Sequence, residues 1–232
     1  FDPRLVGTGT DPFTLIGPMT CPASTTAVPG WNGGVTPFSM AVDREAVAWV
    51  LYTSGEIFTV STQDAACTST GFVPRQAGMD LFGMGFVTDT AGADTEQLFI
   101  GGGSPAATPG GQLGVVDGAT LTVTTLGPLR DDTEYSPELT GTGNAEVFGF
   151  YPGLDEAFVQ EIDRGTGAGV GTEYTIPGGL GGGDGAFVQA WAFAQWGGRF
   201  YLFVTTSEGG ISNSTVRTID RTTGTAATLL QD

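Results

Sequence analysis

The sequence contains no histidine, and its 8 basic residues, all arginine, face 25 aspartates and glutamates, which gives a formal net charge of −17. Without histidine the chain cannot build a Ser-His-Asp triad, a Cys-His pair or an HExxH zinc site. Because phosphate binding needs clustered Lys or Arg, this acidic chain is a poor candidate for binding nucleic acid or anionic lipid.

Long apolar runs are also missing. No stretch approaches the roughly 18 consecutive apolar residues of a membrane helix, so no integral membrane segment is expected. The chain begins at Phe1 without a signal peptide, and we interpret it as a mature or trimmed segment of an exported protein.

Only two cysteines are present, Cys21 and Cys67. They are either two buried free thiols or one disulfide. The Gly/Ser/Thr-rich composition and the absence of lysine favour a secreted protein at the cell surface or outside the cell. Disulfides persist in that environment, so we predict a Cys21–Cys67 bond.

Glycine, in contrast, is abundant, with 39 residues scattered between short apolar runs. This pattern predicts many short strands joined by tight turns, and helical periodicity is weak throughout. The clearest example is Ala46-Val-Ala-Trp-Val-Leu-Tyr-Thr-Ser-Gly-Glu-Ile-Phe-Thr-Val60, which reads as two apolar strands joined at Thr53-Ser-Gly55. The fold class is therefore all-β.

Looser versions of this plan recur along the chain with a period of about 40–50 residues, which is typical of a propeller blade. We predict a single β-propeller domain over residues 1–232, with four blades of four antiparallel strands and five blades as the alternative. The predicted parts are a closing strand and loop at 1–37 and blades at roughly 38–76, 82–128, 138–177 and 188–230. Residues 13–16 are expected to form a strand that extends the last blade beside residues 226–230.

Similar turns end the third strand of two units, Ile162-Asp-Arg-Gly-Thr-Gly167 and Ile219-Asp-Arg-Thr-Thr-Gly224. Asp can bond its own backbone there in an Asx turn, and Gly supplies a positive φ. Together with Pro37-Phe-Ser-Met-Ala-Val-Asp43, Glu138-Leu-Thr-Gly-Thr-Gly143 and Ala190-Trp-Ala-Phe-Ala194, these motifs resemble a family of exported, often lipid-anchored bacterial propeller proteins. The resemblance implies a fold and an export route but no activity.

In a propeller, the loops between blades and those between second and third strands share one face, which commonly carries function. The candidate ligand-binding residues predicted on this face are Trp31, Asn32, Arg75, Asp80, Arg130, Asp132, Glu134, Tyr135, Tyr151 and Asp184. The three aromatic residues are candidate platforms for sugar rings, with Asn32, Asp132 and Asp184 bonding hydroxyl groups. Trp49 and Trp191 lie in apolar strands and are expected in the core or in the packing between blades.

The densest polar cluster is Arg130-Asp-Asp-Thr-Glu-Tyr135. Its carboxylates are the ligand type that Ca²⁺ prefers, although a solvated loop with an Arg–Asp pair is the favoured interpretation, and no cofactor is expected. Paired carboxylates about 5–10 Å apart could also hydrolyse glycosides, and the candidates are Asp80, Asp132, Glu134 and Asp184.

These observations predict an exported, non-enzymatic module that binds a glycan or a protein on its loop face. One alternative is a polysaccharide hydrolase or lyase that uses paired carboxylates. The other is an assembly subunit of the cell surface or of an extracellular structure. The sequence leaves the ligand and the oligomeric state open.

Overall fold

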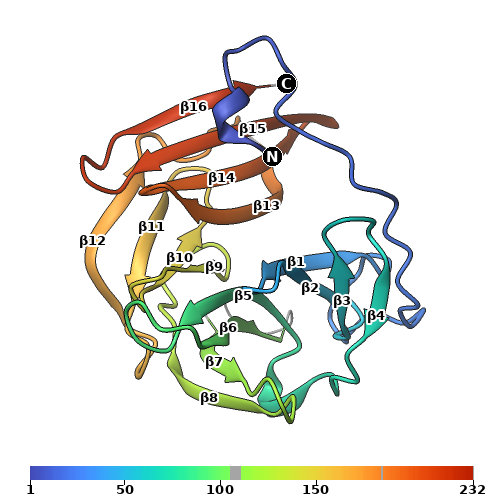
Figure 1. Ribbon diagram of the computed structural model, residues 1–232. Coiled ribbons are helices and arrows are strands. Elements are labelled where there is room, and N and C mark those ends of the chain that lie inside the picture. The colour runs from blue at the N-terminus through green and yellow to red at the C-terminus, as the bar shows by residue number, and fades with distance from the viewer. Residues whose placement is uncertain (105–110, 184, 232) are drawn as a thin grey trace.

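The computed structural model describes residues 1–104, 111–183 and 185–231. Within them, the chain forms four separate four-stranded antiparallel sheets, arranged as the blades of a propeller around a central axis (Figure 1). The predicted all-β class and the four blades of four strands are therefore confirmed. The described part contains no helix long and apolar enough to cross a bilayer.

The strands follow one another from the axis outward in each blade. Blade 1 contains β1 (Pro37–Val42), β2 (Val47–Tyr52), β3 (Ile57–Ser61) and β4 (Cys67–Ser69). Blade 2 contains β5 (Leu81–Thr88), β6 (Glu96–Gly103), β7 (Gln112–Val116) and β8 (Val123–Pro128). Blade 3 contains β9 (Glu138–Gly141), β10 (Val147–Tyr151), β11 (Ala157–Ile162) and β12 (Gly169–Ile176). Blade 4 contains β13 (Phe187–Trp196), β14 (Arg199–Glu208), β15 (Ile211–Asp220) and β16 (Ala226–Gln231).

The turns form as their sequences predict. Asp163 Oδ1 accepts hydrogen bonds from the backbone N–H groups of Gly165 and Thr166, at 3.1 and 2.9 Å. Asp220 repeats this Asx turn in blade 4 with the N–H groups of Thr222 and Thr223. Local side-chain chemistry therefore fixes where these strands end.

Apolar side chains fill the space between blades 1 and 2, 2 and 3, and 3 and 4. The middle strands are buried on both faces, so β10 is apolar at every position, Val-Phe-Gly-Phe-Tyr. Inner strands β5 and β9 approach closely because both strands carry glycine, which has no side chain, where they meet. A Cβ on Gly83 would lie 2.4 Å from the Pro137 carbonyl oxygen, and one on Gly141 would lie 2.0 Å from that of Phe86.

The side between blades 4 and 1 is built differently. No apolar cluster of the described residues joins these two blades. Instead residues 1–35, here called the N-terminal strap, run from blade 4 to blade 1, first along the outside of the ring (Figure 1). The Phe1 and Phe13 rings pack against Phe203 on β14, with ring centroids 5.2 and 6.5 Å apart.

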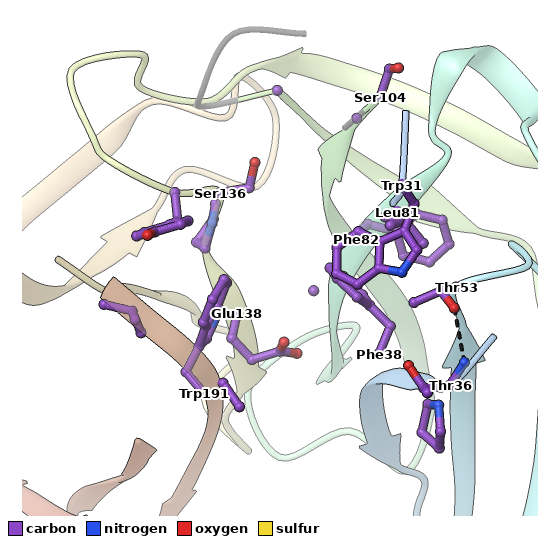
Figure 2. A pocket seen from close by; sticks show the side chains of 18 of the residues that line it. Trp31, Thr36, Phe38, Thr53, Leu81, Phe82, Ser104, Ser136, Glu138 and Trp191 are labelled. Carbon is purple, nitrogen blue, oxygen red and sulfur yellow. Dashed lines mark hydrogen bonds between the residues drawn. The ribbon is translucent and has the colours of Figure 1, made fainter. Parts of the chain in front are cut away.

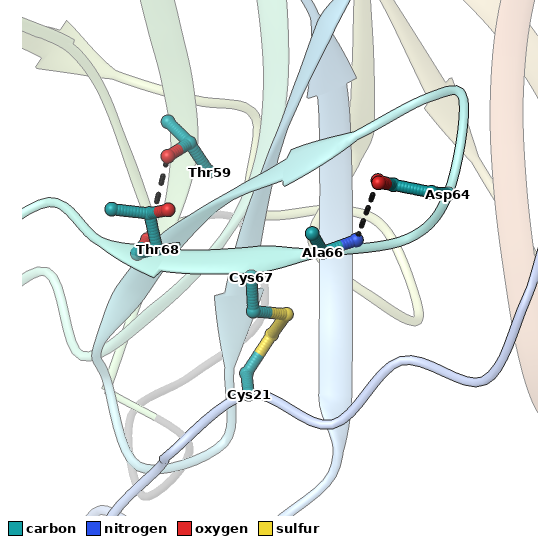
Figure 3. The surroundings of a disulfide bond; sticks show 6 residues. All are labelled: Cys21, Thr59, Asp64, Ala66, Cys67 and Thr68. Atoms are coloured by element: carbon teal, nitrogen blue, oxygen red, sulfur yellow. Dashed lines mark hydrogen bonds between the residues drawn. A yellow bond between two sulfur atoms is a disulfide. The ribbon is translucent and has the colours of Figure 1, made fainter.

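At its other end the strap is attached to blade 1. A disulfide joins Cys21 to Cys67 on β4, as predicted, with 5.1 Å between the Cα atoms (Figure 3). Apolar strap residues on either side of Cys21 also cover the face of blade 1 that points away from blade 2. The strap thus connects the first and last blades.

The predicted strand at residues 13–16 is wrong. These residues form no strand, and the last sheet ends at β16. Pro12 and Pro18 flank the segment, and proline has no N–H to donate to a sheet. Phe13 is held through its ring, whereas Leu15 is 88% exposed.

Candidate functional site

A cavity of about 540 Å³ lies where the four inner strands begin, on the face that receives the loops between blades (Figure 2). All four blades and the strap contribute to its wall. Its lining residues are Trp31, Thr36, Pro37, Phe38, Thr53, Leu81, Phe82, Gly83, Gly103, Ser104, Gly111, Tyr135, Ser136, Pro137, Glu138, Val188, Gln189, Ala190 and Trp191. The volume falls in the range of about 300–1,000 Å³ that is usual for small-molecule sites.

Aromatic side chains form two opposite walls of this cavity. Trp31 and Phe38 pack edge to face with ring centroids 5.7 Å apart, and Tyr135 and Trp191 pack with centroids 5.1 Å apart. Figure 2 shows Trp191 and Trp31 on opposite sides of the open space. A flat, partly apolar ligand can therefore contact aromatic surface on both faces.

Among the described residues, a single carboxyl group faces this space. Glu138, the first residue of β9, is 6% exposed, and its side chain turns towards the cavity (Figure 2). Its Oε1 accepts hydrogen bonds from Ser39 Oγ at 2.5 Å and from the Met84 N–H at 3.1 Å. The Met84 N–H also approaches Ser39 Oγ at 3.0 Å, so the cluster joins β1, β5 and β9.

Burial raises the pKa of Glu138 to about 8, against the lowering effect of the hydrogen bonds from Ser39 and Met84. At neutral pH this side chain is therefore largely the uncharged acid, since desolvation disfavours the carboxylate. Among the described residues, Glu138 is the only Asp or Glu on the cavity wall.

The wall also holds an unpaired donor. Trp31 Nε1 is buried and has no hydrogen-bond partner among the described residues. Buried N–H groups are rarely left unpaired, so this atom is a candidate contact for a bound molecule or an ordered water.

Of the predicted site residues, Trp31 and Tyr135 lie on the cavity wall. Asn32 is exposed beside Trp31 without lining the cavity. Arg75 and Asp80 pair at 3.2 Å in the connection between blades 1 and 2, with Asp80 buried, and neither residue lines the cavity. Asp184 lies outside the described residues.

Of the remaining candidates, Asp132 and Glu134 in the loop before β9 and Tyr151 at the end of β10 help to line a separate depression of about 150 Å³. Arg130 binds Asp132 through two hydrogen bonds of 2.8 and 2.9 Å and also contacts Glu173. The favoured Arg–Asp pair is therefore present. It lowers the pKa of the Asp132 carboxyl.

The structure does not support the sugar platform predicted at Tyr151 or the Ca²⁺ alternative for this loop. Tyr151 is only 1% exposed and stacks on Phe158 with centroids 4.9 Å apart, so its ring is not an available sugar platform. The described residues also contain no group of three acidic, Cys or His side chains placed to hold a metal ion. The carboxylates suggested as Ca²⁺ ligands are thus close in sequence without forming such a group.

Sequence reasoning missed Glu138 as a site residue and did not place Trp191 on the cavity wall. The available signal for Glu138 was an acidic residue at the start of an inner strand. Its partner Ser39 is 99 positions away, which no local pattern reveals. Trp191 packs against the apolar cluster between blades 3 and 4, as expected, and it also lines the cavity.

No protein-family model matches this chain, and no curated protein sequence matches it significantly. Among solved structures, the chain is similar to the crystal structure of an endo-arabinase from Bacteroides thetaiotaomicron. The TM-score is 0.51 with 12% sequence identity, over 92% of this chain and 84% of the other. At this identity, the similarity shows a shared propeller fold only.

Proposed function

We propose that this chain is an exported carbohydrate-binding propeller that holds part of a glycan in the central cavity. The observation that carries the proposal is the pair of aromatic walls on opposite sides of a cavity of about 540 Å³. Sugar rings present C–H faces that pack on aromatic rings, and hydroxyl groups at their edges that need polar partners. Glu138, Ser136 and Gln189 supply polar groups between the walls.

Further observations support this proposal. The Cys21–Cys67 disulfide fits an exported protein, in line with the resemblance of the repeat motifs to exported bacterial propellers. The structural neighbour is named as an endo-arabinase, which places a glycan-active protein on a similar propeller. A protein ligand is less well supported, since stable protein interfaces bury about 800 Å² per partner and a cavity accepts only a small group.

The test is a glycan array of the purified protein, run with calcium and again with EDTA, followed by calorimetry on the hits. Trp191→Ala should weaken binding at least tenfold because it removes one aromatic wall. Trp196→Ala is the matched control, because Trp196 ends the same strand, is 56% exposed and does not line the cavity. An array without hits would contradict glycan binding and would favour a protein partner or a surface-assembly role.

A second candidate function is glycoside hydrolysis. A buried carboxyl with a raised pKa suits the general acid of such enzymes, and Glu138 has this property. The reaction also needs a second carboxylate about 5–10 Å away, and the described wall contains none. We therefore favour binding, which predicts that incubation with an array hit releases no new reducing ends. Release that Glu138→Gln abolishes would establish the enzyme instead.

A further inference from the structure

The cavity wall carries no positive charge. The described residues include all eight arginines, and none of them lines the cavity. Glu138 also forms no ion pair among the described residues, and its hydrogen bonds from Ser39 and Met84 come from neutral donors. An anionic ligand would therefore lose its hydration here without gaining a cation, which is strongly unfavourable.

The hydrogen-bond cluster also leaves one carboxyl oxygen of Glu138 for a bound molecule. Oε1 already accepts hydrogen bonds from Ser39 Oγ and from the Met84 N–H. Neither of these bonds uses Oε2, so a protonated Oε2 can donate a hydrogen bond to a bound molecule. The carboxyl group turns towards the open space, where such a molecule would lie (Figure 2).

From this arrangement, and resting on the proposed function, we infer that Glu138 restricts the cavity to uncharged glycans. It acts as a neutral acid whose Oε2–H donates a hydrogen bond to a hydroxyl, ring or glycosidic oxygen of the sugar. A carboxylate at this position would be an acceptor only and would repel any anionic group on the ligand. Glu138 is thus assigned as a specificity-determining residue.

The other titratable group on the wall does not interfere. Tyr135 packs against Trp191, and burial raises the pKa of its hydroxyl, so it stays neutral over the range in which Glu138 ionises. Loss of binding at alkaline pH would therefore report on Glu138.

The first test compares neutral arabino-oligosaccharides with oligogalacturonates of matched length by calorimetry between pH 6 and 9.5. Wild-type protein should bind the neutral sugars and reject the uronic acids. Its affinity should fall about tenfold at one pH unit above the pKa of Glu138. Glu138→Gln keeps an N–H donor and does not ionise, so its affinity should be independent of pH. Glu45→Gln removes one exposed charge outside the cavity and should behave as wild type.

A second measurement does not depend on a ligand or on a variant. The infrared spectrum of wild-type protein should show a neutral carboxyl C=O band at pH 7 that disappears on titration to pH 10. An ionised Glu138 at pH 7, or uronic acids binding as well as neutral sugars, would overturn the inference while leaving glycan binding intact. A neutral Glu138 with no glycan bound at any pH would instead overturn the proposed function, and the ligand assignment with it.

Discussion

Ser39 on β1 donates a hydrogen bond of 2.5 Å to Glu138 on β9, although the two residues are 99 positions apart in the sequence. The bond crosses the start of the central channel and connects the first and third blades. The candidate site therefore depends on closure of the ring, because no single blade contains it.

The ionisation of Glu138 should link stability to pH. Burial raises its folded-state pKa to about 8 from an ordinary value of 4.5. The protonated side chain therefore contributes stability that is fully present below pH 4.5 and is lost as the pH rises through 8. The total effect is up to roughly 5 kcal/mol. Glu138→Gln should melt at a higher temperature than wild type at pH 9 but not at pH 4, and parallel melting curves across this range would contradict the assignment.

Removing the disulfide should destabilise the protein. The Cys21–Cys67 bond closes a loop with a sequence separation of 46. In the chain-entropy model, a crosslink of this length contributes about 4 kcal/mol. Cys21→Ser/Cys67→Ser should lower the free energy of unfolding in guanidinium by about this amount, and reduction of the wild type should produce the same loss. Hydrogen exchange should rise first in residues 19–35. A double variant as stable as the oxidised wild type would show that the strap is held without the bond.

The aromatic contacts of the strap with blade 4 should be energetically coupled. Phe13 packs against Phe203, and such ring pairs contribute about 0.5–1.5 kcal/mol beyond the buried area. A double-mutant cycle of Phe13→Ala and Phe203→Ala should recover a coupling energy in this range. Leu15→Ala is the control, because the Leu15 side chain is 88% exposed and its loss should change stability by less than about 0.5 kcal/mol. A coupling energy near zero would mean that Phe13 does not attach the strap to blade 4.

The contact between blades 2 and 3 should tolerate no side chain at Gly141. A Cβ there would lie 2.0 Å from the Phe86 carbonyl oxygen, so Gly141→Ala must separate inner strands β5 and β9. We expect a loss of about 1–3 kcal/mol in denaturant unfolding, as for other overpacked sites. Gly143→Ala is the matched control two residues later, because a Cβ there meets nothing within 4 Å. Equal stability of the two variants would contradict the close packing of these blades.

Part of the site was open to prediction from the sequence. The loops around one end of the propeller were expected to form a functional face, and two of the predicted residues, Trp31 from the strap and Tyr135 from the loop between blades 2 and 3, do line the cavity. Tyr151 shows the limit of this reasoning. It ends strand β10 next to a loop, as an exposed platform would, yet it faces the apolar cluster between blades 2 and 3. The face of the sheet to which a strand-end residue points depends on the register of its strand. That register is set only when β10 pairs with its neighbouring strands.

The sequence by itself determined the blades of this protein. Strand length, apolar runs and turns such as those at Asp163 and Asp220 depend on neighbours a few residues away, and local chemistry is sufficient to produce them. Only the tertiary structure decided how the ring closes and which side chains meet at its centre. The strap replaces blade-to-blade packing on one side, and Glu138 meets Ser39 and Met84 from two other blades. Such contacts depend on the relative placement of whole sheets, and burial among those sheets is what keeps the proton on Glu138 at neutral pH.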